Sequence, residues 1–482
     1  MKTHFTLSVF SLPFFLFVNT CIRGRICCLL FAVFIFNIKV FAQPPAASDS
    51  TPKKCTWDLT VPLFNNIAIK SNVSYAKSPF NANCKDVSYD DDETKPGCNP
   101  TDDCVSGEAA LFYDVYYPLH DYNAVKLPAV ILGHPGGFEE CSDLQQNWLV
   151  TVCTTLAKRG YVVFNIEYRR GRVKDAVNPN YRSVQNLAAA YRGCQDERGV
   201  IRSIIKRERL QTEPYRIDTN KIFIGGASAG AVMSFNAAWY TNQMVYDAFP
   251  TPAGFPTVDQ VLDPIDADFY FGETDIEFKQ KIKGVAFLWG GFPIPYSYKG
   301  NEQGFFTNAT LKPFIAFHGL DDPVFPYRLN DPRHEETFSI PPNPGGFNYN
   351  RETRCLISSP YKIDIDANTK DMLNAGPLNA YNILTAVAPT IPKELYLDCN
   401  MMHGLDMNGP GFDSEFGTGY TNTTQVSAYI AQRIATFFQA VMNGATAGSI
   451  NPSKFTECEN KRKKCDPPPL PLCDNNTICP NE

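Results

Sequence analysis

The chain lacks an excess of basic residues and lacks the residue spacing of a metal site. Its 44 lysine and arginine residues stand against 50 aspartate and glutamate residues, a net charge of −6. Nucleic-acid binding needs a concentrated basic face, and the one dense basic run, 461–464, indicates a solvated tail. Beyond residue 42 the sequence has no Cys-x-x-Cys pair and no histidine pair at ligand spacing. Neither a nucleic-acid partner nor zinc is therefore expected.

An unbroken apolar run of the about 20 residues that a membrane-spanning helix needs is also lacking. Two shorter runs, 5–18 and 27–42, flank Arg23 and Arg25. The second run follows basic residues and ends at a small residue, which is typical of a signal peptide. We predict that residues 1–42 are removed, that the protein is secreted or otherwise extracytoplasmic, and that no stable membrane insertion follows. The first run is either an upstream start-site artefact or a short membrane anchor.

Cysteine usage agrees with export. Of the 16 cysteines, three lie in the leader, which leaves an odd number in the presumed mature chain. Such density suits an oxidising compartment, in which disulfides tie loop-rich segments together. Two terminal segments are predicted on this basis, a Cys-rich one at 43–108 and a Cys/Pro-rich tail at 446–482. Their clustered cysteines are Cys55, Cys84, Cys98, Cys104, Cys458, Cys465, Cys473 and Cys479.

Between these segments, short apolar runs alternate with longer amphipathic stretches. Continuous apolar strands separated by helices predict an α/β fold over 109–445, with a mostly parallel sheet covered on both faces. Two stretches without clear periodicity, 242–280 and 329–375, are predicted insertions that shape a substrate cleft. The expected strands are 110–117, 129–133, 161–168, 221–225, 284–289, 313–317 and 394–398, and the expected helices are 143–158, 184–207, 229–241, 378–386 and 425–443.

The central chemical signal is the pentapeptide Gly226-Ala227-Ser228-Ala229-Gly230. It follows the apolar run Ile222–Ile224 and opens a stretch rich in small residues. A serine nucleophile must be lifted from its strand on a sharp turn, and flanking glycines relieve the crowding there, which explains a G-x-S-x-G spacing between strand and helix. Ser228 is therefore the predicted nucleophile.

Upstream, the apolar run Ala129–Gly133 leads into His134-Pro135-Gly136-Gly137. Acyl transfer needs N–H donors aimed at the oxygen that becomes negative. The backbone N–H groups of Gly136, Gly137 and Ala229 are the predicted oxyanion hole. These motifs resemble those of α/β-hydrolase carboxylesterases, especially the hormone-sensitive-lipase-like and type-B esterases. Pro135 departs from the His-Gly-Gly-Gly that is usual in those families.

The resemblance covers roughly residues 109–440 and implies the α/β-hydrolase fold, a triad in the chain order Ser, Asp, His, and no metal or organic cofactor. The segment 318–324, His-Gly-Leu-Asp-Asp-Pro-Val, is similar to the family segment that delivers the triad acid. That similarity implies Asp322 as the acid, with Asp321 as the less favoured alternative. Histidine is scarce, with six in the chain. His403 follows the last expected strand, where the superfamily carries its base, so we predict it as the base rather than His318.

These residues and the resemblance together predict a secreted serine hydrolase that cleaves small-molecule or polymer-linked carboxylic esters. Two alternatives stay open. A peptidase of the prolyl-oligopeptidase type shares the fold and triad, but only about 65 residues precede the expected sheet in the presumed mature chain, too few for the large N-terminal propeller of that type. A catalytically inactive α/β-hydrolase could serve as a binding or adhesion module, but such proteins usually lose a triad member, and all three candidates are present here.

Overall fold

The computed structural model divides the chain into two units, residues 1–56 and 57–482. It describes residues 58–79, 108–119, 125–138, 144–169, 179–241, 244, 281–295, 298, 300–320, 322, 324–328, 348–350, 355–358, 372–398, 401–405 and 422–447, all in the second unit. The predicted signal peptide and all eight clustered cysteines lie outside these residues. So do nearly all of the first predicted insertion and the C-terminal tail beyond residue 447.

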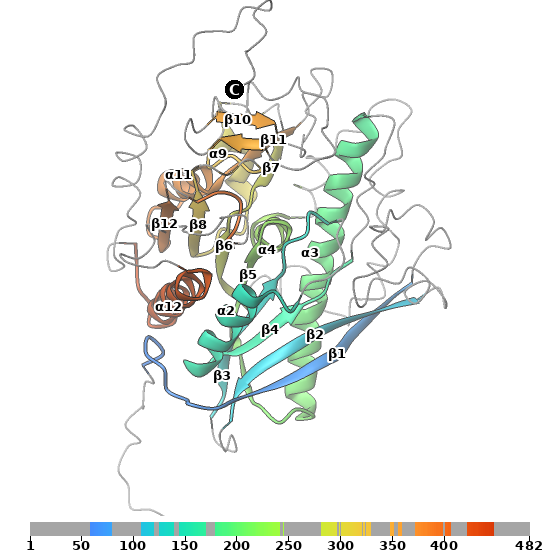
Figure 1. The fold of residues 1–482 in the computed structure, drawn as a ribbon, viewed down its shortest axis with the longest axis vertical. Helices are drawn as coiled ribbons and strands as arrows, with labels where there is room; N and C mark the ends of the chain where they lie inside the picture. The colour runs from blue at the N-terminus through green and yellow to red at the C-terminus, as the bar shows by residue number, and fades with distance from the viewer. Residues whose placement is uncertain are drawn as a thin grey trace, which may run out of the picture. The chain divides into compact units, whose positions relative to one another are not determined.

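An eight-stranded sheet forms the centre of the second unit, in the order β1-β2-β4-β3-β5-β6-β8-β12 (Figure 1). The strand β2 pairs antiparallel with both β1 and β4, and every later pairing, from β4–β3 to β8–β12, is parallel. The bounds are β1 Ile67–Pro79, β2 Glu108–Pro118, β3 Leu127–Gly133, β4 Val162–Ile166, β5 Ile217–Ala227, β6 Ile282–Leu288, β8 Phe314–Gly319 and β12 Lys393–Asp398. The mostly parallel sheet of the predicted α/β-hydrolase fold is confirmed.

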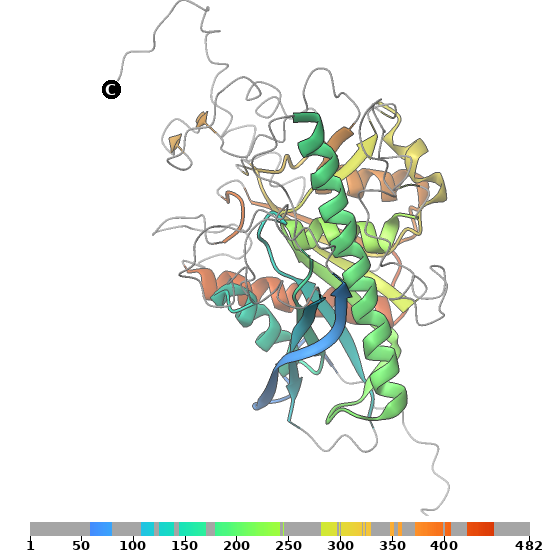
Figure 2. The same ribbon diagram turned by 90° about the vertical axis from the view of Figure 1, so that its right-hand side faces the viewer.

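Helices cover both faces of this sheet, as Figures 1 and 2 show. On one face, α2 (Asn147–Lys158) and α12 (Thr423–Met442) lie side by side and bury their apolar residues against the strands. On the other face pack α3 (Pro179–Leu210), α4 (Ala229–Trp239) and α11 (Pro377–Val387). Because both faces are covered, every residue of β3 and β4 is buried, which explains their continuous apolar sequences.

Several short elements lie outside the sheet and were not expected from the sequence. The strands β7 (Phe292–Pro295) and β11 (Met372–Ala375) form an antiparallel pair, and β9 (Asn348–Asn350) pairs with β10 (Cys355–Ser358). Three of these strands fall within the predicted insertion 329–375. The helix α9 (Glu302–Phe305) and the 3-10 turn η3 (Phe306–Asn308) precede β8.

The edge strand β1 extends the sheet into the segment that the sequence placed before the catalytic domain. It pairs with β2 from Ile67, opposite Pro118, to Pro79, opposite Glu108. Register shifts between Lys70 and Val73 and between Ser74 and Ala76 interrupt this pairing. Such bulges break the alternation of buried and exposed side chains that identifies a strand in a sequence, and the expected first strand was therefore β2.

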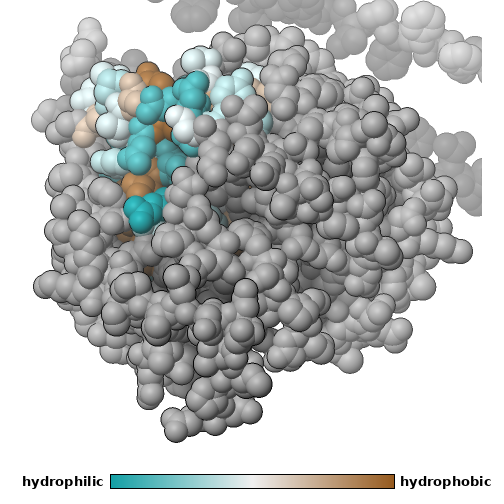
Figure 3. Space-filling view, turned by 90° about the horizontal axis from the view of Figure 1, so that it is seen from above, coloured by the Kyte–Doolittle hydropathy of each residue, from teal (hydrophilic) through white to brown (hydrophobic). Residues whose placement is uncertain are grey.

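The described residues on one face of the molecule are mixed in character. Seen from above, hydrophilic and hydrophobic side chains stand next to one another (Figure 3). Among the residues that the structure describes, no helix combines the length and apolarity needed to cross a membrane.

Candidate active site

The three predicted triad residues follow three strands of the parallel part of the sheet. Ser228 follows β5, Asp322 lies shortly after β8, and His403 lies shortly after β12. Carboxyl ends of parallel strands meet at one edge of a sheet, where ligands bind in open α/β folds. The sheet order β5-β6-β8-β12 therefore brings residues 175 and 81 positions apart in the chain to one place.

Ser228 stands on a strained turn. Its backbone has φ 52° and ψ −116°, a conformation that residues other than glycine rarely adopt. Two neighbours hold it there, because its N–H donates to Leu288 O of β6 at 3.0 Å and its carbonyl accepts from Val232 N in the first turn of α4 at 3.0 Å. A Cβ atom at Gly230 would lie 2.2 Å from Gly133 O. The second glycine of the G-x-S-x-G motif is therefore needed for α4 to approach the end of β3.

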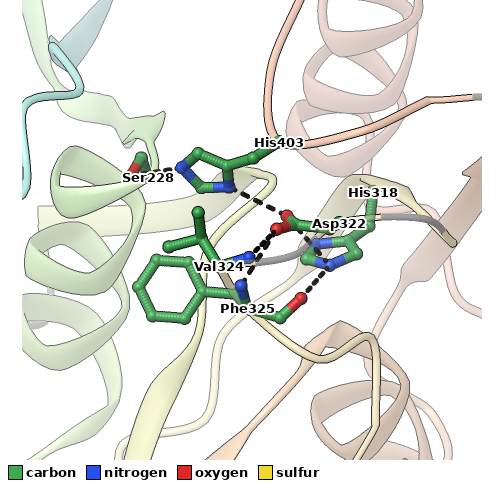
Figure 4. A network of polar contacts seen from close by, with 6 residues as sticks. All are labelled: Ser228, His318, Asp322, Val324, Phe325 and His403. Atoms are coloured by element: carbon green, nitrogen blue, oxygen red, sulfur yellow. Dashed lines mark hydrogen bonds and ion pairs between the residues drawn. The ribbon is translucent and has the colours of Figure 1, made fainter. Parts of the chain in front are cut away.

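The three side chains form a hydrogen-bonded chain (Figure 4). The Nε2 atom of His403 lies 2.8 Å from Ser228 Oγ, and its Nδ1 atom lies 2.9 Å from Asp322 Oδ2. The carboxylate only accepts, so Nδ1 carries a proton and Nε2 of the neutral ring is left to accept the serine proton. The structure thus brings the predicted nucleophile, base and acid together in the order that proton transfer from a serine requires.

Asp322 is held on both of its oxygen atoms. Oδ1 accepts from the backbone N–H groups of Val324, at 2.8 Å, and Phe325, at 2.9 Å, while Oδ2 faces His403. Burial of this carboxyl acts to raise its pKa. The neighbouring imidazoles of His403 and His318 and the Phe325 N–H outweigh burial, so the pKa of Asp322 lies below its ordinary value. Asp322 is therefore held as the carboxylate.

The predicted oxyanion donors follow two neighbouring strands, β3 and β5. Gly136 and Gly137 have φ values of 135° and 63°, which glycine adopts without steric cost. Ala229 is the first residue of α4, where the backbone N–H has no partner within the helix. All three positions provide N–H donors near the carboxyl edge of β3 and β5, since these two strands pair from Ala129 to Gly133.

A buried aromatic contact supports the loop that carries the two glycines. The ring of His134, fully buried, stacks on Tyr168 with centroids 4.4 Å apart, and the Tyr168 hydroxyl donates to His134 O at 2.9 Å. His134 Nε2 lies 3.5 Å from the buried carboxylate of Glu167. The sequence did not predict this contact. His134 and Tyr168 follow β3 and β4, and only the pairing of these two strands in the folded sheet brings them together.

The sequence also offered an alternative base and an alternative acid. His318, the other candidate base, is fully buried at the end of β8 and contacts Asp322, not Ser228. Asp321, the alternative acid, lies outside the described residues. Among the residues that the structure does describe, no three histidine, cysteine, aspartate or glutamate side chains converge into a group that could hold a metal ion.

Together, the sheet order, the strained serine turn and the Ser228–His403–Asp322 geometry are those of an esterase-type α/β-hydrolase. The segment 113–332 matches the family model BD-FAE, an α/β-hydrolase-type esterase family. This segment contains the oxyanion loop, the serine and the acid, and His403 lies beyond it. No curated protein matches the chain.

Solved structures of esterase 2 from Thermogutta terrifontis are similar to the chain. The apo form has 15% identity over 68% of this chain and 90% of that chain, with a TM-score of 0.37. The form phosphonylated by cyclosarin has 15% identity over 70% of this chain and 91% of that chain, with a TM-score of 0.38. The propionate-bound form has 15% identity over 70% and 92%, with a TM-score of 0.36.

Proposed function

We propose that this protein is an exported serine esterase that forms an acyl-enzyme on Ser228. The observation that carries the proposal is the continuous chain of short contacts from Ser228 Oγ through His403 to Asp322. A serine is a weak nucleophile until a base takes its proton, and a base works best when a third group fixes its tautomer. The G-x-S-x-G turn and the BD-FAE match of residues 113–332 support the same reaction class.

The reaction begins with attack of Ser228 Oγ on the ester carbonyl carbon while His403 Nε2 takes the hydroxyl proton. The carbonyl oxygen becomes negative and accepts hydrogen bonds from the backbone N–H groups of Gly136, Gly137 and Ala229. His403 then gives its proton to the departing alcohol, and the acyl group stays on Ser228. Water gives a proton to His403 as it attacks the acyl-enzyme, and His403 returns that proton to Ser228 Oγ as the carboxylic acid is released. Asp322 stabilises the imidazolium in both halves of the reaction.

A fluorophosphonate probe tests the nucleophile directly. Mass spectrometry of the labelled protein should find the phosphonyl group on the peptide containing Ser228, and Ser228→Ala should abolish labelling. His403→Gln should slow labelling by roughly a thousandfold or more, because the serine loses its base. Labelling of Ser228→Ala to the same extent as the unaltered protein would contradict the proposal.

Substrate class and export need separate experiments. Hydrolysis of p-nitrophenyl esters of increasing acyl length, set against aminoacyl anilides, should show turnover of the esters; faster turnover of the anilides would favour the peptidase alternative. Labelling without turnover of either would favour a binding role. Export predicts that protein collected outside cells of a secreting host begins at Gln43, as read by mass spectrometry of its N-terminal peptide.

A further inference from the structure

We propose that His318 is a positioning residue, which acts through Asp322 to keep His403 in register with Ser228. The side chain is fully buried at the end of β8 and belongs to no step of the reaction above. Its Nε2 atom lies 3.1 Å from Phe325 O and 3.4 Å from Asp322 Oδ2 (Figure 4). The role deepens the proposed function, since it concerns the acid of the same site.

The contact with Phe325 determines which ring nitrogen carries a proton. A carbonyl oxygen accepts hydrogen bonds and donates none. The Nε2 atom of His318 must therefore be protonated, and its N–H donates to Phe325 O. The same nitrogen also lies 3.4 Å from Asp322 Oδ2, farther than from the Phe325 carbonyl. His318 thus places an N–H group beside Oδ2, in addition to that of His403 Nδ1.

The three contacts of Phe325 show why this donor matters for geometry. Its N–H donates to Asp322 Oδ1 at 2.9 Å, its carbonyl accepts from His318, and its ring lies against His403 with centroids 5.7 Å apart. His318 therefore links the rigid strand β8 to the turn that orients both the acid and the base. Without the His318 side chain, the buried hydrogen bond that joins the end of β8 to Phe325 O would be lost.

A matched pair of variants separates hydrogen bonding from packing. Glutamine and methionine are both unbranched and of similar length, and the glutamine amide nitrogen can occupy the place of His318 Nε2. His318→Gln therefore keeps a donor there, and His318→Met fills similar space without one. With a p-nitrophenyl ester, His318→Met should lower kcat by roughly 10- to 100-fold with KM changed by less than about threefold, because displacement of a catalytic group by about 1 Å costs a factor of this order. His318→Gln should stay within about fivefold of the unaltered protein.

Tyr161→Phe provides the control for a stability loss alone. It removes another buried hydrogen bond, from the Tyr161 hydroxyl to Ala435 O at 3.1 Å. Tyr161 directly precedes β4, whereas the triad residues follow the carboxyl ends of their strands. This variant should unfold more easily and keep its kcat. If His318→Met keeps kcat within about threefold, or if the glutamine and methionine variants lose activity equally, His318 serves only packing and the inference fails.

A spectroscopic readout distinguishes this failure from failure of the esterase proposal. The proton shared by His403 Nδ1 and Asp322 should give a far-downfield NMR resonance in protein with ¹⁵N-labelled histidine. We expect that resonance in the unaltered protein and in His318→Gln, and expect it to be lost or shifted upfield in His318→Met. An identical resonance in all three would overturn the positioning role even if the protein hydrolysed no ester. Absence of ester turnover with the expected resonance pattern would overturn only the proposed function.

Discussion

Replacement of Gly319 by alanine should disable the site while leaving the fold in place. Gly319 is the last residue of β8, and a Cβ atom there would lie 2.0 Å from Met401 O, 2.5 Å from Met401 C and 2.6 Å from Met402 O. These are backbone atoms of the loop that carries His403, so no side chain can rotate away to make room. Since real Cβ atoms essentially never approach closer than 3.0 Å, the loop must move by at least about 1 Å.

The expected cost follows from the hydrogen bonds of His403. At 2.8 and 2.9 Å, both are near the ideal length, and a shift of ~1 Å carries them past the roughly 3.2 Å limit of a good bond. We expect kcat for a p-nitrophenyl ester to fall by about 100-fold or more. Overpacking of this kind costs about 1–3 kcal/mol of unfolding free energy, so the variant should still fold.

Gly444→Ala is the matched control. This glycine follows α12, has φ 78°, and a Cβ atom added to it would meet no other atom within 4 Å. Alanine there costs about 1–2 kcal/mol through backbone strain alone and should leave kcat unchanged. Active-site titration with a fluorophosphonate and thermal unfolding should be measured on both variants. A Gly319→Ala enzyme with kcat within about threefold of the unaltered protein would refute the steric argument.

Three further predictions concern the acid, the oxyanion loop and a buried carboxyl. Asp322→Asn should lower kcat by about 10⁴-fold, because the amide favours the wrong tautomer of the base, as steady-state ester hydrolysis would show. Tyr168→Phe removes the bond to His134 O and should destabilise the protein by about 1 kcal/mol in denaturant unfolding, with kcat lowered more than KM is changed. Burial raises the pKa of Glu197 well above its ordinary 4.5. The protonated form of Glu197 therefore contributes its full stability below pH 4.5, and this contribution is lost as the pH rises through the pKa of the folded protein. Glu197→Gln should therefore gain stability relative to the unaltered protein between about pH 4 and pH 8, as thermal unfolding at both pH values would test, and an unchanged difference would contradict it.

The sequence predicted seven strands of the eight-stranded sheet and the serine turn, because both depend on local pattern. The apolar runs of β3, β5 and β8 are continuous since those strands are buried on both faces. The turn at Ser228 needs small residues on either side, and these appear as a fixed spacing in the chain. The expected positions of Asp322 and His403 came instead from family resemblance, and the structure places both next to Ser228.

Other features depend on contacts that no local pattern records. The helix α3 extends beyond the expected range at both ends, Pro179–Leu210 rather than 184–207. Its middle buries polar residues, which breaks the amphipathic pattern. Asp196 there pairs with Arg169 at 2.8 Å, and Glu197 accepts from Ser234 at 2.8 Å. These partners lie 27 and 37 positions away, so the sequence alone could not show that the two buried carboxyl groups have polar partners.

The relative positions of the triad residues therefore depend on backbone contacts between neighbouring strand ends more than on the triad side chains themselves. Gly230 lies against Gly133, the serine N–H is bonded to β6, and Gly319 lies against the His403 loop. Each contact joins segments that follow different strands of one sheet, and the buried sheet sets their spacing. None of the residues in these contacts belongs to the predicted insertions 242–280 and 329–375. Such an arrangement separates the parts of the chain that hold the reacting atoms from those predicted to shape the cleft.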